Sequence, residues 1–441
     1  MTSENRKRWI GLMLVFFLCL ACFSAPFRCF ATFPHELRLF SGQGKLLQLS
    51  MPVGASVTVK DPDIVHVNGS ADPTFKINLK HPIALQSEQS GQTEMKVKLF
   101  GKIPYKTVKV SVMPDLKVVP GGQTIGVKLK SAGILVVGHH MVTVQDDRKT
   151  SPGEEARVQV GDLIVSIDGK PLNDVSKVSE LAAKAGEQGR ALELSIMRGD
   201  QKLKLQLRPA YDKTDKMYRL GLYIRDSAAG VGTLTFYAPE QGMYGALGHI
   251  ITDMDTQTPI VVGSGEIVHS NVTSISKSQN GEPGEKRAQF NKGVLGNIEK
   301  NTPFGIFGRM PEAPEHGVDG QAIPVAFAEE VKEGPAEIYT VIGGQKVEKF
   351  TIEITHIAKQ EYPATKGLVI KITDPRLLEK TGGIVQGMSG SPIIQNGKLI
   401  GAVTHVFVND PTSGYGCFIE WMLQDAGILA ADKPQKELKA S

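Results

Sequence analysis

Cysteine is scarce in the main body of this chain. Of its four cysteines, Cys19, Cys22 and Cys29 lie in or just after an N-terminal apolar stretch, and only Cys417 lies in the remaining sequence. The body therefore has no internal disulfide. Cys19 and Cys22 have the spacing of a redox or zinc pair, but the apolar run around them offers no partner ligands.

Aromatic residues, clustered basic charge and metal-binding motifs are also lacking. Aromatic residues make up 6% of the chain, and 50 basic against 46 acidic residues give a net charge of +4 without a basic block in the body. This composition excludes a nucleic-acid partner. The adjacent His139 and His140 point to opposite sides of a strand and no H-E-x-x-H motif occurs, so we expect no metal and no cofactor.

One long hydrophobic run is present, at Trp9–Phe27, where 19 residues carry no charge and follow the basic residues Arg6, Lys7 and Arg8. No cleavage site with a permissive following residue appears, so the run favours an uncleaved membrane anchor within residues 1–30 over a removed signal peptide. The basic flank places the rest of the chain outside the cytoplasm.

The remaining chain reads as several mainly β domains, since 441 residues exceed one ordinary domain. Residues 31–118 show period-2 alternation bounded by glycine and proline, with lysines on the solvent face. We expect a small β-rich domain that serves as a spacer or docking module. Residues 213–432 contain many short apolar runs separated by turn signals, which favours a β-barrel or a pair of barrels with one C-terminal helix.

Residues 119–212 have a more specific order of elements. A strand at 133–138 is followed by "SPGEEARVQVGDLIVSIDGKPL", a predicted helix near 174–185, and a hairpin around Gly199 and Asp200. This order resembles a bacterial PDZ domain, which binds an extended peptide as an added strand. By that resemblance the glycine-containing loop before the first strand receives the peptide, at Ile125, Gly126 and Val127.

The stretch "GGIVQGMSGSPII" places Ser389 among small residues between two predicted strands. A tight turn that admits only small side chains is one interpretation, and a catalytic nucleophile is the other. A nucleophilic serine needs N–H donors for the oxyanion, a histidine base and an orienting carboxylate. Gly387 and Ser389 could supply the N–H donors. The motif is similar to the G-D-S-G-G-P signature of chymotrypsin-like peptidases, with Met388 replacing the aspartate.

His249 is the histidine that lies between small residues at the end of a predicted strand, in "YGALGHIITDMDT". It precedes Ser389, as the histidine precedes the serine in chymotrypsin-like enzymes. His405 follows the serine and fits packing or a pocket wall better. The joint presence of His249 and Ser389 favours a serine endopeptidase over two alternatives, a non-catalytic PDZ scaffold that organises a membrane signalling complex and a chaperone-like PDZ protein.

The PDZ segment, "YGALGHIITDMDT" and "GGIVQGMSGSPI" together resemble the SpoIVB (stage IV sporulation protein B) family of serine peptidases of endospore-forming bacteria. The resemblance implies a chymotrypsin-like peptidase exported into the space between the forespore and mother-cell membranes. There it cleaves itself and the extracytoplasmic domain of a membrane-bound regulator of an intramembrane metalloprotease, which then processes a late sigma factor precursor.

The resemblance also implies catalytic roles: Ser389 as nucleophile, His249 as general base and acid, and Asp374 as the orienting carboxylate. Asp374 stands close to the serine in sequence, whereas chymotrypsin-like folds take this aspartate from the first barrel. Sequence topology by itself therefore favours Asp253 or Asp255, and the orienting residue stays open between these positions.

Overall fold

The computed structural model describes most of the chain after the N-terminal run: residues 35–48, 53–315, 317–318, 320–360 and 362–429, with positions 9, 11–13, 15 and 16. Most of the predicted anchor lies outside the described residues. Within them, no helix is long and apolar enough to cross a bilayer. The chain divides into two compact units, Met1–Leu116 and Lys117–Ser441.

The first unit is built from two antiparallel-rich sheets that share one apolar core, as expected of a small β domain. Alternation decides which side chains enter the core, because Met95 and Val97 are buried while Lys96 and Lys98 between and beyond them face solvent. The sheets have the strand orders β1-β8-β7-β3-β5 and β2-β6-β4. The strands are β1 Glu36–Phe40, β2 Gly44–Leu47, β3 Gly54–Val59, β4 Val65–Val67, β5 Thr74–Asn78, β6 Ile83–Ser87, β7 Gly91–Leu99 and β8 Ile103–Met113.

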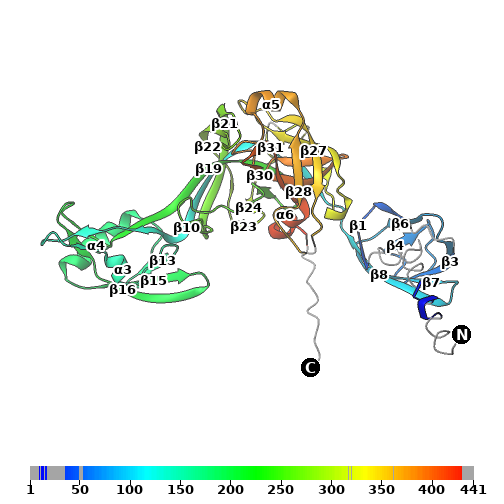
Figure 1. Cartoon of the computed structure of the whole chain (residues 1–441), viewed down its shortest axis with the longest axis horizontal. Coiled ribbons are helices and arrows are strands. Elements are labelled where there is room, and N and C mark those ends of the chain that lie inside the picture. Colours follow the sequence, from blue (N-terminus) through cyan, green and yellow to red (C-terminus); the bar gives the residue numbers. More distant parts are fainter. Residues whose placement is uncertain are drawn as a thin grey trace. The chain divides into compact units, whose positions relative to one another are not determined.

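Two long strands dominate the second unit, β10 (Thr124–His139) and β19 (Leu222–Ala238), and Figure 1 shows them running side by side. They pair antiparallel over most of their length, with register shifts after Lys130 and after Val136. On one side of the first shift they belong to the predicted PDZ domain, here called the PDZ part, and on the other they enter the predicted peptidase domain, here called the peptidase part. The sequence pattern places the segment 119–138 wholly within a PDZ domain at 119–212, whereas in the structure this segment contributes to both parts.

The PDZ part has the predicted elements. Its helix α4 (Ser176–Glu187) buries Val178, Ala182 and Ala185 on one face. The sequence Asp168-Gly169 forms a turn with positive φ at both residues, 51° and 72°. The other elements are β11 Val142–Thr143, β12 Lys149–Thr150, α3 Pro152–Glu155, β13 Leu163–Ile167, β14 Lys170–Pro171, β15 Leu192–Arg198, β16 Gln201–Leu207, β17 Ala210–Asp212 and β18 Met217–Arg219.

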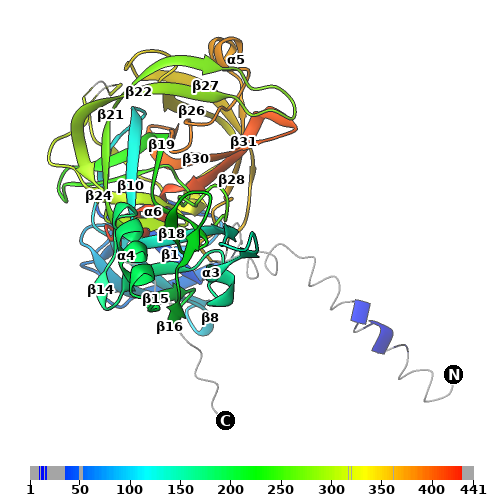
Figure 2. The same cartoon turned by 90° about the vertical axis from the view of Figure 1, so that its left-hand side faces the viewer.

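The peptidase part combines an open sheet with a closed barrel. The barrel has the order β26-β27-β28-β31-β30-β29, and Figure 2 shows α5 beside its strands. The open sheet includes β10 and β19, so the prediction of one or two barrels is confirmed for one. Its other strands are β9 Lys117–Pro120, β20 Met243–Ala246, β21 Val262–Ser276, β22 Glu285–Asn297, β23 Lys300–Thr302, β24 Gly305–Arg309 and β25 Ile323–Pro324; a short 3-10 helix, η1, spans Ala328–Glu330. The barrel elements and helices are β26 Gly334–Thr340, β27 Glu348–Ile357, β28 Leu368–Ile372, α5 Pro375–Thr381, β29 Pro392–Gln395, β30 Lys398–Phe407, β31 Asp410–Phe418 and α6 Ile419–Ala426.

Candidate active site

Ser389 lies in a tight loop between α5 and β29. Gly387 and Gly390 on either side have φ of +93° and +94°, which side-chain-bearing residues rarely adopt. A Cβ on Gly390 would also come within 2.1 Å of the Thr233 carbonyl oxygen. The hydroxyl of Ser389 donates a hydrogen bond to the carbonyl of Thr404, at 2.8 Å. The small residues on either side of Ser389 are therefore required by the backbone geometry of the loop.

Strand β19 holds this loop from the open sheet. Thr233 donates its N–H to the carbonyl of Ser389 at 3.0 Å and its hydroxyl to the carbonyl of Gly387 at 2.7 Å. Thr235 donates its hydroxyl to the carbonyl of Gly390 at 2.8 Å. Both threonines are fully buried. The loop belongs to the barrel side of the molecule, but the open sheet fixes its position.

Two N–H groups of the loop have no hydrogen-bond acceptor among the described residues. From Gln386 to Ser391 every backbone N–H donates a hydrogen bond within the described part of the chain, except those of Gly387 and Ser389. These are the two groups that the sequence suggests for an oxyanion site. Paired donors next to a serine hydroxyl are what acyl transfer requires to stabilise the oxyanion.

His249 follows β20 after two residues, Leu247 and Gly248, that both have positive φ (72° and 69°). A Cβ on Gly248 would meet the side chain of Thr404 at 3.0 Å, so this turn packs against the strand whose carbonyl holds Ser389. Nδ1 of His249 lies 2.9 Å from the carbonyl oxygen of Ile250. That contact fixes the tautomer with the proton on Nδ1, which leaves Nε2 free to accept a proton.

A cavity of about 840 Å³ brings the predicted residues together, since His249, Ser389 and Gly387 all line it. Burial lowers the pKa of His249 below its ordinary value, and the hydrogen bond to Ile250 partly offsets this effect. The imidazole is therefore neutral at pH 7, as a general base must be. The cavity's other titratable or charged side chains are Arg225, Asp253, Lys366 and His405.

His405 lies beside the predicted base, with its ring centroid 5.3 Å from that of His249. Desolvation lowers the pKa of His405 below its ordinary value, and positive charge on His249 and Lys366 acts in the same direction. A second cation next to His249 is thereby avoided at neutral pH. The position in the cavity wall agrees with the pocket-wall interpretation of this residue.

Asp374 does not orient His249, and this corrects the assignment that the resemblance implies. It is the N-cap of α5, and its Oδ1 accepts the N–H of Arg376 at 2.9 Å. Its Oδ2 accepts from the Arg376 guanidinium at 2.9 Å and from the N–H of Thr351 at 3.3 Å. The Arg376 hydrogen bond is the main cause that holds the pKa of Asp374 below its usual range. Both carboxylate oxygens of Asp374 are therefore hydrogen-bonded to other groups, and Asp374 does not line the cavity.

Asp253 and Asp255, the alternatives, lie in the loop after His249 but contact Arg225 instead. Asp253 is buried, and its Oδ2 accepts from the Arg225 guanidinium. Asp255 accepts from the other nitrogen of Arg225 at 2.7 Å. No hydrogen bond joins a carboxylate to His249 in the part of the chain that the structure describes. The Ile250 carbonyl occupies the place expected for the carboxylate.

Ile125, Gly126 and Val127 do not form a peptide-binding loop, which corrects the second site prediction. They lie inside β10, with β19 paired along one edge and β21 along the other. All three are buried, and a Cβ on Gly126 would come within 2.7 Å of the Phe290 ring. Because both edges are occupied, no peptide strand can be added there.

An open strand edge, which the sequence pattern does not predict, occurs at β19 between 222 and 226. Here β19 pairs with β10 on one side, and no other described strand pairs with the opposite side. Helix α4 meets this region at its start, where the N–H of Val175 donates to the Asp226 carboxylate at 3.1 Å, and near its end Gly186 contacts Tyr218 of β18. Gly221, with φ +68°, precedes the edge. The signal is "RLGLYI", a glycine between apolar residues just before a strand.

Comparisons with known proteins agree with this organisation. Residues 216–423 match the family model described as SpoIVB peptidase S55, and residues 123–208 match that of a PDZ domain. A segment of 60 residues, 14% of this chain, is 37% identical to a putative serine protease HhoA of Synechocystis and spans 15% of that protein.

Among solved structures, the active form of the Rv3671c protease of M. tuberculosis is 15% identical with a TM-score of 0.26, covering 47% of this chain and 77% of that one. Its inactive form is 16% identical with a TM-score of 0.27, covering 45% and 84%.

The family matches and the cavity together define a serine peptidase that carries a PDZ domain. The residues that match the SpoIVB peptidase S55 model, 216–423, contain both His249 and Ser389.

Proposed function

We propose that this protein is a chymotrypsin-like serine endopeptidase in which Ser389 is the nucleophile and His249 the general base and acid. The observation that carries the proposal is the single cavity lined by His249, Ser389 and Gly387, together with the N–H groups of Gly387 and Ser389, which have no acceptor among the described residues. A scaffold has no need for this combination. Residues of the open sheet and of the closed barrel contribute one catalytic side chain each, as a two-lobed peptidase requires.

Before the reaction, the Ser389 hydroxyl donates a hydrogen bond to the Thr404 carbonyl. Ser389 turns this hydroxyl to Nε2 of His249, which takes the proton as the oxygen attacks the scissile carbonyl carbon. The carbonyl oxygen becomes an oxyanion and accepts from the N–H groups of Gly387 and Ser389. His249 then gives the proton to the leaving amine. A water molecule, deprotonated by His249, hydrolyses the acyl-enzyme and restores Ser389.

The PDZ part supplies a place for an extended peptide at the open edge of β19. A strand added at 222–226 would pair with the backbone of β19 and lie against α4, in the mode of peptide recognition by strand addition. Gly221, with positive φ, forms the turn that leads into this edge. This site recruits a protein substrate, or a segment of the chain itself.

The SpoIVB resemblance supports a more specific role. In this role the protein is exported by the forespore and acts at the membrane between forespore and mother cell. It cleaves itself and the extracytoplasmic domain of a membrane-bound regulator that restrains an intramembrane metalloprotease. Cleavage of the regulator starts the processing of a late sigma factor precursor.

The test is proteolysis by the purified full-length protein, with Ser389→Ala and His249→Ala as variants. Wild-type protein should cleave itself and the extracytoplasmic domain of such a regulator, and it should react with a fluorophosphonate at Ser389. Both variants should lose cleavage while their thermal unfolding stays unchanged, and the double variant should lose no more than either one. If Ser389→Ala protein cleaves at the wild-type rate, the nucleophile is elsewhere. If wild-type protein neither cleaves nor reacts with the fluorophosphonate, the scaffold alternative gains support.

A further inference from the structure

The orientation of His249 depends on a backbone carbonyl rather than on a carboxylate. Nδ1 of His249 contacts the carbonyl oxygen of Ile250, the next residue. The Ile250 carbonyl can orient the imidazole ring only if the backbone that follows Ile250 is fixed in position. The next residue, Ile251, is held at both its N–H and its carbonyl by the side chain of Asn301, at 2.8 Å each. The loop that follows needs a second anchor at its far end.

Asp253 provides the internal bonds of that loop. Its Oδ1 accepts the N–H groups of Asp255 and Thr256, at 3.0 Å each, and its own N–H donates to the carbonyl of Thr258 at 2.9 Å. Only 1% of its side chain is exposed. A carboxylate this deeply buried requires a compensating cation, because its desolvation is otherwise uncompensated.

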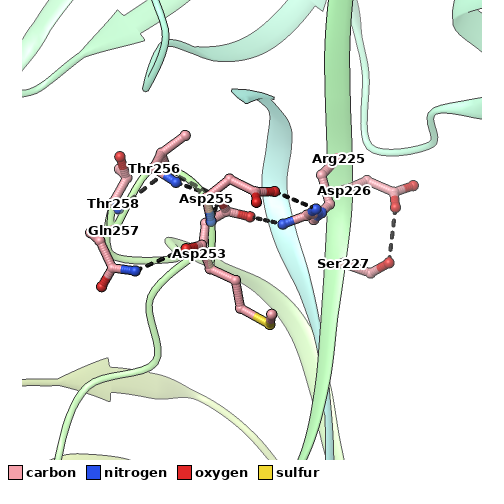
Figure 3. A network of polar contacts seen from close by, with 9 residues as sticks. Arg225, Asp226, Ser227, Asp253, Asp255, Thr256, Gln257 and Thr258 are labelled. Carbon is pink, nitrogen blue, oxygen red and sulfur yellow. Dashed lines mark hydrogen bonds and ion pairs between the residues drawn. The ribbon is translucent and has the colours of Figure 1, made fainter. Parts of the chain in front are cut away.

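Arg225 is that cation, and it lies on β19. Its guanidinium divides between Asp253 and Asp255, and Figure 3 shows the two carboxylates of the loop facing the strand from which Arg225 extends. The same strand holds the nucleophile loop through Thr233. One strand therefore anchors the loops of both predicted catalytic residues, at positions eight residues apart in sequence.

We propose that Arg225 and Asp253 are positioning residues for His249: their ion pair holds the loop after His249, so that the Ile250 carbonyl keeps the imidazole oriented toward Ser389. The inference rests on the proposed role of His249 as general base. Arg225 also belongs to the 222–226 segment of β19, so the orientation of His249 is tied to the strand that carries the open PDZ edge.

The rate at which a fluorophosphonate labels Ser389 tests the proposal without knowledge of the natural substrate. Full-length Arg225→Met, Asp253→Asn and double variants are compared with wild type from pH 4.5 to 8. Each single variant should react about 10-fold more slowly, and the double variant should match the singles, because either change releases the same loop. Arg225→Lys should recover part of the rate.

The pH profile separates positioning from a simple charge effect. Loss of the Ile250 hydrogen bond lowers the pKa of His249, so the acid limb of labelling should move to lower pH in both single variants. If the variants changed only the charge near His249, Arg225→Met would raise the pKa of His249 and Asp253→Asn would lower it. The two acid limbs would then move in opposite directions. Opposite shifts, additive losses or unchanged rates would overturn the proposal.

A matched control is the exposed ion pair Lys128–Glu266, 2.9 Å long, which joins β10 to β21. Lys128→Met and Glu266→Gln should label at the wild-type rate. Arg225→Met or Asp253→Asn protein could keep the wild-type labelling rate and acid limb while a smaller fraction of the protein is labelled. The ion pair would then be merely structural, and the proposal would fail. If Ser389→Ala protein is labelled like wild type, the proposed function itself fails, which is a different outcome.

Discussion

Lys286, on β22, is a buried lysine, and its replacement should stabilise the protein by an amount that depends on pH. Only 1% of the residue is exposed, and its alkyl chain packs against Gly387. Its Nζ donates to the hydroxyl of Thr340 at 2.7 Å. Burial lowers the pKa of Lys286 from 10.5 to about 7.

The sign and size of the effect follow from linkage. Between pH 7 and 10 the unfolded chain keeps the proton that the native amine has lost, so native stability rises with pH over this range. A pKa change of this size costs the native state about 4 kcal/mol at pH 7 and about 2 kcal/mol at pH 9. In Lys286→Met the thioether chain fills the same space, and Thr340 loses one partner at a cost of about 1–3 kcal/mol.

We therefore expect Lys286→Met to be more stable than its parent by about 1–3 kcal/mol at pH 7, and to lose about 2 kcal/mol of that advantage at pH 9. Urea unfolding in a Trp9→Phe, Ser389→Ala background checks this, because Trp421 on α6 then reports on the peptidase part and self-cleavage is absent. Lys292→Met, at an exposed lysine of the same strand, is the control. An advantage equal at both pH values would refute the burial argument.

Two further outcomes follow from the site. Asp374→Asn keeps the side-chain oxygen that caps α5 and loses an ion pair to an exposed arginine, so activity should stay within about 3-fold of wild type and stability within about 1 kcal/mol. A loss near 10⁴-fold at unchanged stability would return Asp374 to the catalytic group. Because burial lowers the pKa of His249 below 6.5, activity should rise through an acid limb whose midpoint lies below pH 6.5 and should stay level to pH 8. A limb above pH 6.5 in the kcat/KM profile would show that His249 is more solvated than the structure indicates.

Local patterns in the sequence are enough to predict many elements of this protein. The alternation of Met95 and Val97 with lysines, the turn at Asp168 and Gly169, and the one-sided apolar face of α4 each depend on neighbours a few residues away. The loop around Ser389 is of this kind too, since Gly387 and Gly390 are needed for its own backbone. Such features can be recognised without knowing what lies across from them.

Other features depend on which segment lies opposite, and the sequence pattern of one segment does not contain that information. Gly126 has the sequence surroundings of a binding loop, but β19 and β21 cover both of its edges. Lys286 looks like any strand lysine until the Ser389 loop closes over it. Asp374 is a plausible catalytic aspartate in the sequence, yet the fold pairs it with Arg376 and gives His249 the carbonyl of Ile250. Contacts between distant segments are set by the packing of the whole sheet and barrel, and only the tertiary structure decides them.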